Sequence, residues 1–153
     1  MISVFIERVP TRLVADTPGE LERVLDELLS GPEDYPLGTV EDPHVIADLY
    51  PGDVTGEEDD DEQKLPVVWL HVSVQPHDSI GAIGYVWTDG TTTDSWEASA
   101  SEHSPGLLYS THSGGRFDTD TALPLDTVAR AVRKFAETGT PPTCVTWRQE
   151  TLV

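Results

Sequence analysis

Basic residues are what this sequence has least of. Nine of its 153 residues are Lys or Arg, against 28 that are Asp or Glu, so the formal net charge is −19. A nucleic-acid surface needs a basic stripe with interleaved aromatic residues, and anionic lipid headgroups repel an acidic chain. The composition therefore argues against nucleic acid or a membrane as the partner. It fits either a partner with a basic surface or acidity that serves only solubility, and charge alone favours the second.

Cysteine and long apolar runs are also scarce. The single cysteine, Cys144, excludes an internal disulfide. No apolar run approaches the roughly 20 residues of a membrane-spanning helix. Residues 1–10 lack both a basic leader and a small-residue cleavage site, so no signal peptide is expected. We therefore expect a cytoplasmic protein.

The hydrophobic patterns predict one α+β domain over residues 1–153, an antiparallel β-sheet meander packed with two amphipathic helices. Alternating apolar residues predict strands over residues 2–9, 65–74, 80–87, 92–98, 107–112, 116–118 and 144–147. Residues 12–15 are expected to extend the first strand after Pro10, and residues 45–50 fit a short strand or a turn of helix. In the strand at 80–87, the small-residue face of Ala82, Gly84 and Val86 is expected to accept a helix.

The two predicted helices have recognisable ends. Thr17 and Glu20 have the spacing of a capping box before an apolar stripe that runs to Leu29. The second helix follows Pro124, which suits a first helical turn, and Gly139 can take the left-handed conformation that ends it. Each helix has one apolar face, so both are expected to cover one face of the sheet.

The acidity belongs to one part of the chain. Residues 16–62 contain 17 of the acidic residues and one basic residue, Arg23. The run Glu57, Glu58, Asp59, Asp60, Asp61 and Glu62 places six carboxylates in succession. Because adjacent like charges repel and bury nothing, we expect a mobile acidic loop at about residues 55–63.

No residue pattern indicates catalysis, a metal site or a cofactor. The five histidines, at positions 44, 71, 77, 103 and 112, lack the spacing of a metal motif, and the acidic runs lack the EF-hand pattern. Ser110, His112 and Asp118 are close in sequence, but no G-x-S-x-G elbow accompanies them. Cys144 lies in a predicted strand and is expected to be a small core residue.

The C-terminal third contains a series of short motifs: Phe117-Asp118, Leu123-Pro124, the helix pattern Val128, Ala131, Val132 and Phe135, then Thr138-Gly139, Pro142 and Val145-Thr146-Trp147. In this order the motifs resemble the Imm1 family of bacterial immunity proteins. It extends more loosely over residues 65–112, and residues 33–64 lie outside it. The resemblance implies a non-enzymatic protein that binds and blocks a toxin domain, often a nucleic-acid deaminase, encoded beside it in a polymorphic or contact-dependent toxin system.

The acidic composition and the family resemblance both fit an inhibitor that binds a basic toxin. A toxin that acts on nucleic acid has a basic cleft, to which an acidic inhibitor is steered. We expect the toxin to bind the following residues: Asp48, Asp53, Glu57, Glu58, Asp59, Asp60, Asp61, Glu62, Trp87, Asp89 and Trp96. Two alternatives stay open, namely a small hydrolase or metal enzyme in which His71, His112 and a carboxylate converge, and a general acidic adaptor.

Overall fold

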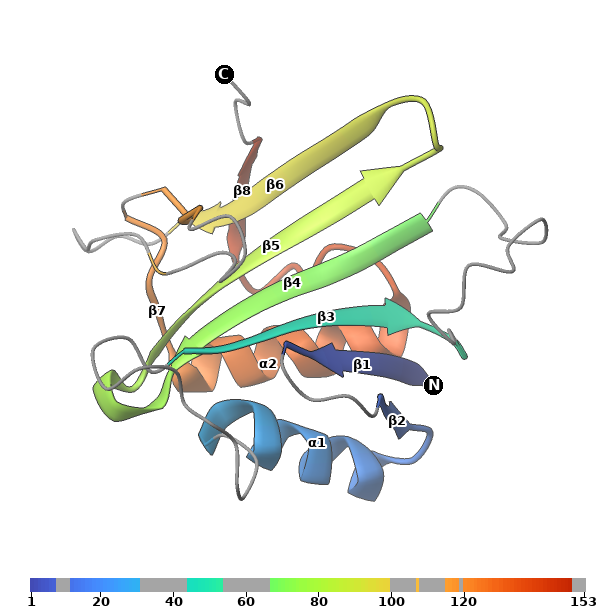
Figure 1. Ribbon diagram of the computed structural model, residues 1–153, viewed down its shortest axis with the longest axis vertical. Helices are drawn as coiled ribbons and strands as arrows, with labels where there is room; N and C mark the ends of the chain where they lie inside the picture. Colours follow the sequence, from blue (N-terminus) through green and yellow to red (C-terminus); the bar gives the residue numbers. More distant parts are fainter. Residues whose placement is uncertain are drawn as a thin grey trace.

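The protein is organised around a single antiparallel sheet with both helices on one face (Figure 1). The computed structural model describes residues 1–7, 12–30, 44–53, 67–99, 107, 115–118 and 120–149. Within these residues the sheet has eight strands, and α1 (Pro18–Ser30) and α2 (Leu125–Thr138) are the α-helices. The predicted α+β class and the antiparallel sheet with two helices are confirmed.

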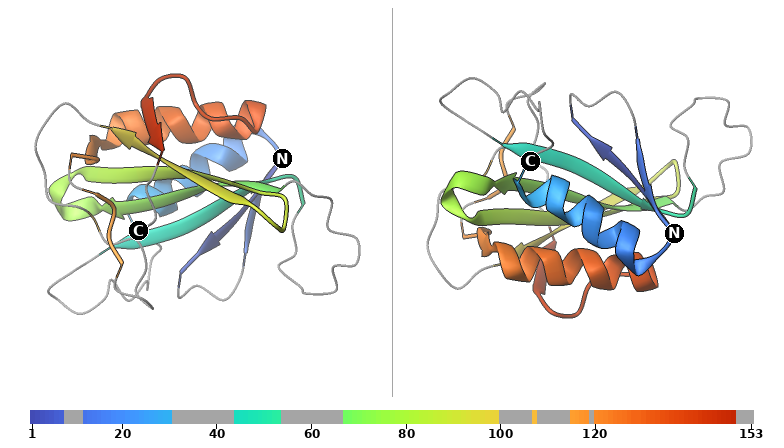
Figure 2. Two further views of the ribbon diagram at one scale, coloured as in Figure 1. Left: turned by 90° about the horizontal axis from the view of Figure 1, so that it is seen from above. Right: turned by 90° about the horizontal axis from the view of Figure 1, so that it is seen from below.

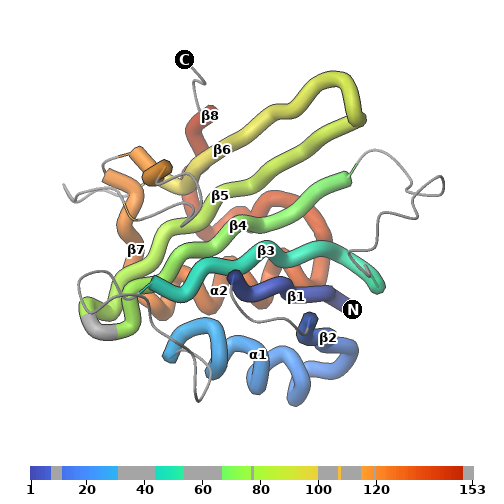
Figure 3. Tube along the Cα trace, viewed as in Figure 1, coloured from blue at the N-terminus to red at the C-terminus, as the bar shows by residue number. Residues whose placement is uncertain are grey.

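Long-range pairs hold the sheet together as much as hairpins do. The strands are β1 (Ile2–Ile6), β2 (Leu13–Ala15), β3 (Val45–Pro51), β4 (Val67–Gln75), β5 (Ile80–Thr88), β6 (Thr93–Ser99), β7 (Leu123–Pro124) and β8 (Thr146–Gln149). Their order across the sheet is β2-β1-β3-β4-β5-β6-β8, and β7 pairs with the start of β5. Figure 3 shows the C-terminal β8 lying beside β6. The ends of the chain therefore complete the two sides of a sheet whose centre is β3–β4–β5.

Both helices form where the sequence predicts them. The Thr17 hydroxyl accepts a hydrogen bond of 3.2 Å from the Glu20 N–H, as an N-cap does. At the end of α2, Gly139 has a φ of +67°, and its N–H donates to the Phe135 carbonyl at 2.7 Å. This left-handed turn is the ending that the glycine predicts. Neither helix, in the described residues, has the length and apolar character to cross a membrane.

The main core lies between the sheet and the two helices, which lie side by side in Figure 2. Alternate residues of each long strand enter it, because successive side chains of a strand point to opposite faces. The central contributors are Val4, Val45, Leu49, Leu70, Val72, Val74 and Ile83 from the sheet, with Leu25, Leu28, Val128, Val132 and Phe135 from the helices. All of them are fully or almost fully buried.

Two predictions about the sheet are wrong. Residues 13–15 do not extend β1 but turn back and pair with it antiparallel, Leu13 opposite Val4. The helix also does not pack on the small-residue face of β5. It packs on the opposite face, where a Cβ added to Gly81 would lie 2.9 Å from Val128 Cγ2. Gly81 therefore provides the space for α2, and Ala82 and Gly84 face the other way.

The remaining element predictions have mixed outcomes. Residues 45–50 belong to a strand, and this settles the choice between strand and helical turn. The strands predicted at 80–87 and 92–98 are confirmed within one residue at each end. The strand predicted at 107–112 and the acidic loop at 55–63 lie outside the described residues, apart from Leu107.

Candidate functional site

The sheet face that carries neither α1 nor α2, called here the helix-free face, holds a row of polar side chains. The strand register aligns Asp48 of β3 with His71 of β4, Gly84 of β5, Glu97 of β6 and Arg148 of β8. Side chains of paired strand residues at one level share a face. Residues from five strands, far apart in the sequence, therefore meet on a single surface.

Asp48 and His71 form the closest contact of this row. Nδ1 of His71 lies 2.5 Å from Oδ1 of Asp48, and the Asp48 side chain is 37% exposed, against 8% for His71. The Phe117 ring lies over the imidazole, with 5.9 Å between ring centroids. An imidazole oriented by a carboxylate resembles part of a catalytic dyad, but this one lies beneath a phenyl ring. The contacts make His71 a packing residue and leave Asp48 as the partly exposed group.

The segment around Phe117 covers part of the helix-free face. Phe117 is buried with Leu107 and Ala82 in a small second core, and its Cε1 lies 3.5 Å from where a Gly84 Cβ would be. The backbone N–H of Asp118 donates to Glu97 Oε2 at 2.9 Å, and the Asp118 carboxylate lies 3.9 Å from an Arg148 nitrogen. This Phe-Asp pair is therefore an anchor that fixes its segment on β4, β5 and β6.

Beyond that segment, three aromatic rings form a cluster on the helix-free face. Tyr50 makes an edge contact with Phe5, with centroids 5.7 Å apart, and a tilted contact with Trp69 at the same distance. All three side chains are partly exposed. Burial against the neighbouring rings and the Asp48 charge raise the pKa of Tyr50 to about 12. Asp48 thus acts electrostatically on this aromatic cluster, defined here as Phe5, Tyr50 and Trp69.

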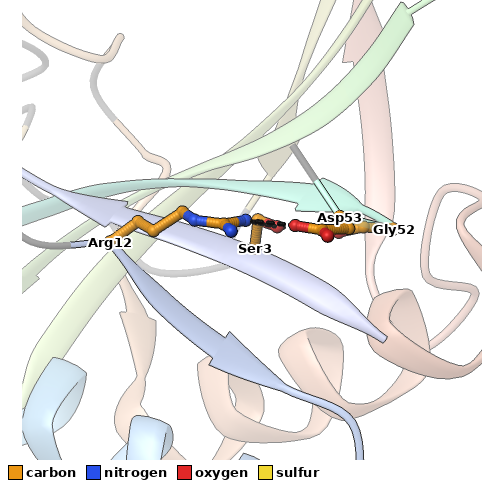
Figure 4. Close-up of polar contacts among 4 residues, drawn as sticks. All are labelled: Ser3, Arg12, Gly52 and Asp53. Atoms are coloured by element: carbon orange, nitrogen blue, oxygen red, sulfur yellow. Dashed lines mark hydrogen bonds and ion pairs between the residues drawn. The ribbon is translucent and has the colours of Figure 1, made fainter. Parts of the chain in front are cut away.

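A charged network borders the aromatic cluster at the end of β3 (Figure 4). Arg12 forms an ion pair with Asp53 and donates to the Ser3 hydroxyl at 3.4 Å. That hydroxyl donates to the Gly52 carbonyl at 2.7 Å. Because Ser3 pairs with Tyr50 across β1 and β3, the network lies next to the rings. Asp53 is 60% exposed, so its carboxylate reaches solvent even though Arg12 offsets its charge.

The other expected partner-binding residues lie elsewhere. Trp87 and Trp96 are partly buried against the main core, which places them on the helix side of the sheet. Asp89 lies exposed at the tip of the β5–β6 hairpin, where hydrogen bonds from the Thr92 and Thr91 N–H groups lower its pKa. These three residues do not share a face with Asp48. Glu57 to Glu62 lie outside the described residues.

The described residues bring together no metal-binding group of three or more His, Cys, Asp or Glu. His44 is buried, and His103 and His112 lie outside the described residues, so the convergence of His71 with His112 is not observed. A pocket of about 350 Å³ lies on the helix side, lined by Met1, Leu21, Arg133 and neighbours, and includes no histidine, cysteine or serine.

Sequence reasoning missed Phe5 and Tyr50 as surface residues. Phe5 alternates with the buried Val4 and Ile6, and Tyr50 follows the buried Leu49, so both face away from the core. The alternation in the sequence indicates that Phe5 and Tyr50 face away from the core. It does not indicate that the rings are neighbours, because that depends on β1, β3 and β4 lying side by side.

Comparison with known proteins links the chain to a protein family. The family model described as immunity protein Imm1 matches residues 10–149, almost the whole chain. No curated protein matches the chain. The match includes Phe117-Asp118 and the Pro142–Trp147 turn, where the indole N–H of Trp147 donates to the Pro142 carbonyl at 2.8 Å.

Proposed function

This chain belongs to the Imm1 family of immunity proteins, and we propose that it neutralises a cognate toxin by direct stoichiometric binding through an acidic surface. Membership of the family implies a toxin as partner and a non-enzymatic role. The observation that carries the acidic surface is the charge distribution, since 17 of the 28 acidic residues fall in residues 16–62. Such a field raises the rate of encounter with a basic partner.

The toxin that fits this charge acts on nucleic acid, as a deaminase or nuclease does. An enzyme that binds a polyanion needs a basic cleft, because phosphate contacts supply much of its affinity. A protein with a net charge of −19 competes for that cleft by presenting carboxylates in place of phosphates. This mode of inhibition needs no catalytic group on the inhibitor.

The acidic surface in this proposal has two parts. Asp48 and Asp53 belong to β3 and its end, next to the aromatic cluster, and Glu57 to Glu62 follow in the chain before β4 begins. The hairpin residues Trp87, Asp89 and Trp96 form a separate candidate contact at the β5–β6 turn. The two regions are distinguishable by mutation because they lie on different parts of the sheet.

Co-expression with the product of the adjacent open reading frame tests the proposal. The expected result is that the neighbouring protein stops growth when expressed alone, that this chain restores growth, and that the two co-purify in a fixed ratio. A complex that weakens as salt is raised implicates the acidic surface, because screening acts on exposed charges. A neighbour that is not toxic, or a toxin that this chain neither binds nor neutralises, contradicts the proposal.

A further inference from the structure

We infer that the aromatic cluster of Phe5, Tyr50 and Trp69 is the anchor of the toxin interface, and that it receives an arginine or lysine side chain of the toxin beside the Asp48 carboxylate. The inference rests on the proposed function and adds to it a location on the helix-free face. It also names the chemistry of the partner group. Four observations support the inference: the packing of the rings, the charge beside them, the residues that border them and their exposure to solvent.

The first observation is that the rings are not part of the core. Tyr50 contacts both Phe5 and Trp69, yet none of the three belongs to the two buried clusters of the described residues or packs against them as a partly buried neighbour. By contrast, Trp87, Trp96 and Trp147 all pack against the main core. Large aromatic residues kept together at a surface are typical of binding hot spots, where Trp and Tyr are enriched.

The second observation is the placement of negative charge at the rings. Asp48 is two residues from Tyr50 on the same strand face and lies directly opposite Phe5 across β1 and β3. The face of an aromatic ring attracts a cation, and a carboxylate beside the ring adds a charged hydrogen-bond acceptor. A guanidinium or ammonium group can make both contacts at once. A phosphate or carboxylate of a ligand would be repelled.

The third observation is that the aromatic cluster has a charged pair at one border and a covering segment at the other. The Arg12–Asp53 pair lies next to Tyr50 at one border. At the other, the Phe117 segment covers His71 and Gly84. An apolar centre within a charged rim is the usual anatomy of a protein interface.

The fourth observation is that a partner can reach the rings, because all three rings and Asp48 are partly exposed in the free protein.

The test measures the affinity of single variants for the product of the adjacent open reading frame, purified from the co-expressed complex. Tyr50→Ala and Trp69→Ala are each expected to raise the Kd by about 30-fold or more, as hot-spot truncations do. Asp48→Asn is expected to raise it about 10-fold, and to make binding less dependent on salt because one charge contact is lost. Leu21→Ala and Glu137→Gln, matched truncation and charge changes on the helix side, are expected to leave the Kd within about twofold.

Footprinting of the wild-type protein guards against variants that fail to fold. Hydroxyl radicals are expected to modify Tyr50 and Trp69 less in the complex than in the free protein, while the peptide that carries α1 reacts equally in both. If folded Tyr50→Ala and Trp69→Ala bind the toxin with the same Kd as the wild-type protein, the inference is wrong and the proposed function stands. The same conclusion follows if Tyr50 and Trp69 are modified equally in the free protein and in the complex. If the wild-type protein does not bind at all, the proposed function itself fails.

Discussion

At the scale of single residues, Gly81 determines how closely α2 approaches the sheet. A Cβ at this position would lie 2.9 Å from Val128 Cγ2 and 3.1 Å from the Ser73 carbonyl oxygen. Gly81→Ala is therefore expected to lower the free energy of unfolding by about 1–3 kcal/mol through overpacking, measured by urea denaturation. Gly19→Ala is the control, because nothing lies within 4 Å of its Cβ and the change is expected to stabilise by about 0.5 kcal/mol. Equal stability of Gly81→Ala and wild type would contradict this account.

Tyr50 makes the stability dependent on pH in the alkaline range. Burial, with a smaller effect of Asp48, raises its pKa from 10.0 to about 12, so the folded state keeps the phenol proton where the unfolded state loses it. The stability that this group contributes is fully present below pH 10 and is lost as the pH rises through about 12. The wild-type protein is therefore expected to lose more stability across this window than Tyr50→Phe does. Identical pH profiles for the two proteins would show that Tyr50 is not perturbed.

The role of Asp48 at this phenol has its own test. Because the Asp48 charge contributes to the raised pKa, Asp48→Asn is expected to lower the pKa of Tyr50. Ultraviolet difference absorbance of tyrosinate, taken against the same protein with Tyr50→Phe, measures the change. Asp89→Asn at the hairpin removes the same charge elsewhere and is expected to leave the Tyr50 pKa where it is. A Tyr50 pKa that responds equally to both variants would mean that only net charge matters.

At the scale of elements, the two faces of the sheet carry their aromatic residues for different reasons. Phe135 of α2 is fully buried in the main core and makes an edge contact with Tyr85, with centroids 6.2 Å apart, whereas Phe5 lies on the helix-free face. Phe135→Ala is expected to cost about 3–5 kcal/mol of unfolding free energy, since it leaves a cavity under α2. Phe5→Ala is expected to cost about 1 kcal/mol, as loss of one aromatic pair does. Equal losses in denaturation would mean that Phe5 belongs to the core.

The elements themselves could be predicted from the sequence, because their signals are local. Thr17 and Gly139 mark helix ends through hydrogen bonds within a few residues of each, and Asp89-Gly90 marks the β5–β6 turn in the same way. What the sequence does not encode locally is which strands become neighbours. The pairing of β1 with β3 joins residues more than 40 positions apart, and β6 with β8 about as many. The face of β5 that accepts α2 is also not evident from the sequence, because a single glycine, Gly81, permits the close approach of Val128.

The same distinction explains what was predicted of the site. Asp48 and Asp53 were recognisable as acidic residues by type, and their expected role as contacts stays a prediction. The aromatic cluster was not recognisable, because Phe5, Tyr50 and Trp69 come from three strands that meet only in the folded sheet. Trp87 and Trp96 are also predicted as toxin contacts, yet their strand register directs them to the helix side.

At the scale of the whole molecule, the run from Glu57 to Glu62 lies in the segment that joins the end of β3 to the start of β4. In the sequence, Tyr50 of the aromatic cluster precedes this segment and Trp69 follows it. Six adjacent carboxylates act at a distance on a basic partner, whereas the rings act only on contact. The run is therefore expected to govern the rate of association, and the rings the rate of dissociation.

Neutralising the run tests this division. With its glutamates changed to Gln and its aspartates to Asn, the association rate with the toxin is expected to fall about tenfold at about 50 mM salt and to approach the wild-type rate at about 500 mM. The dissociation rate is expected to stay the same, because long-range charge acts mainly on the rate of encounter. Neutralising Glu20, Asp26 and Glu27 of α1, on the opposite layer, is expected to slow association less per charge. If the association rate is unchanged at both salt concentrations, electrostatic steering by this run is wrong, while the contact role of the aromatic cluster is left standing.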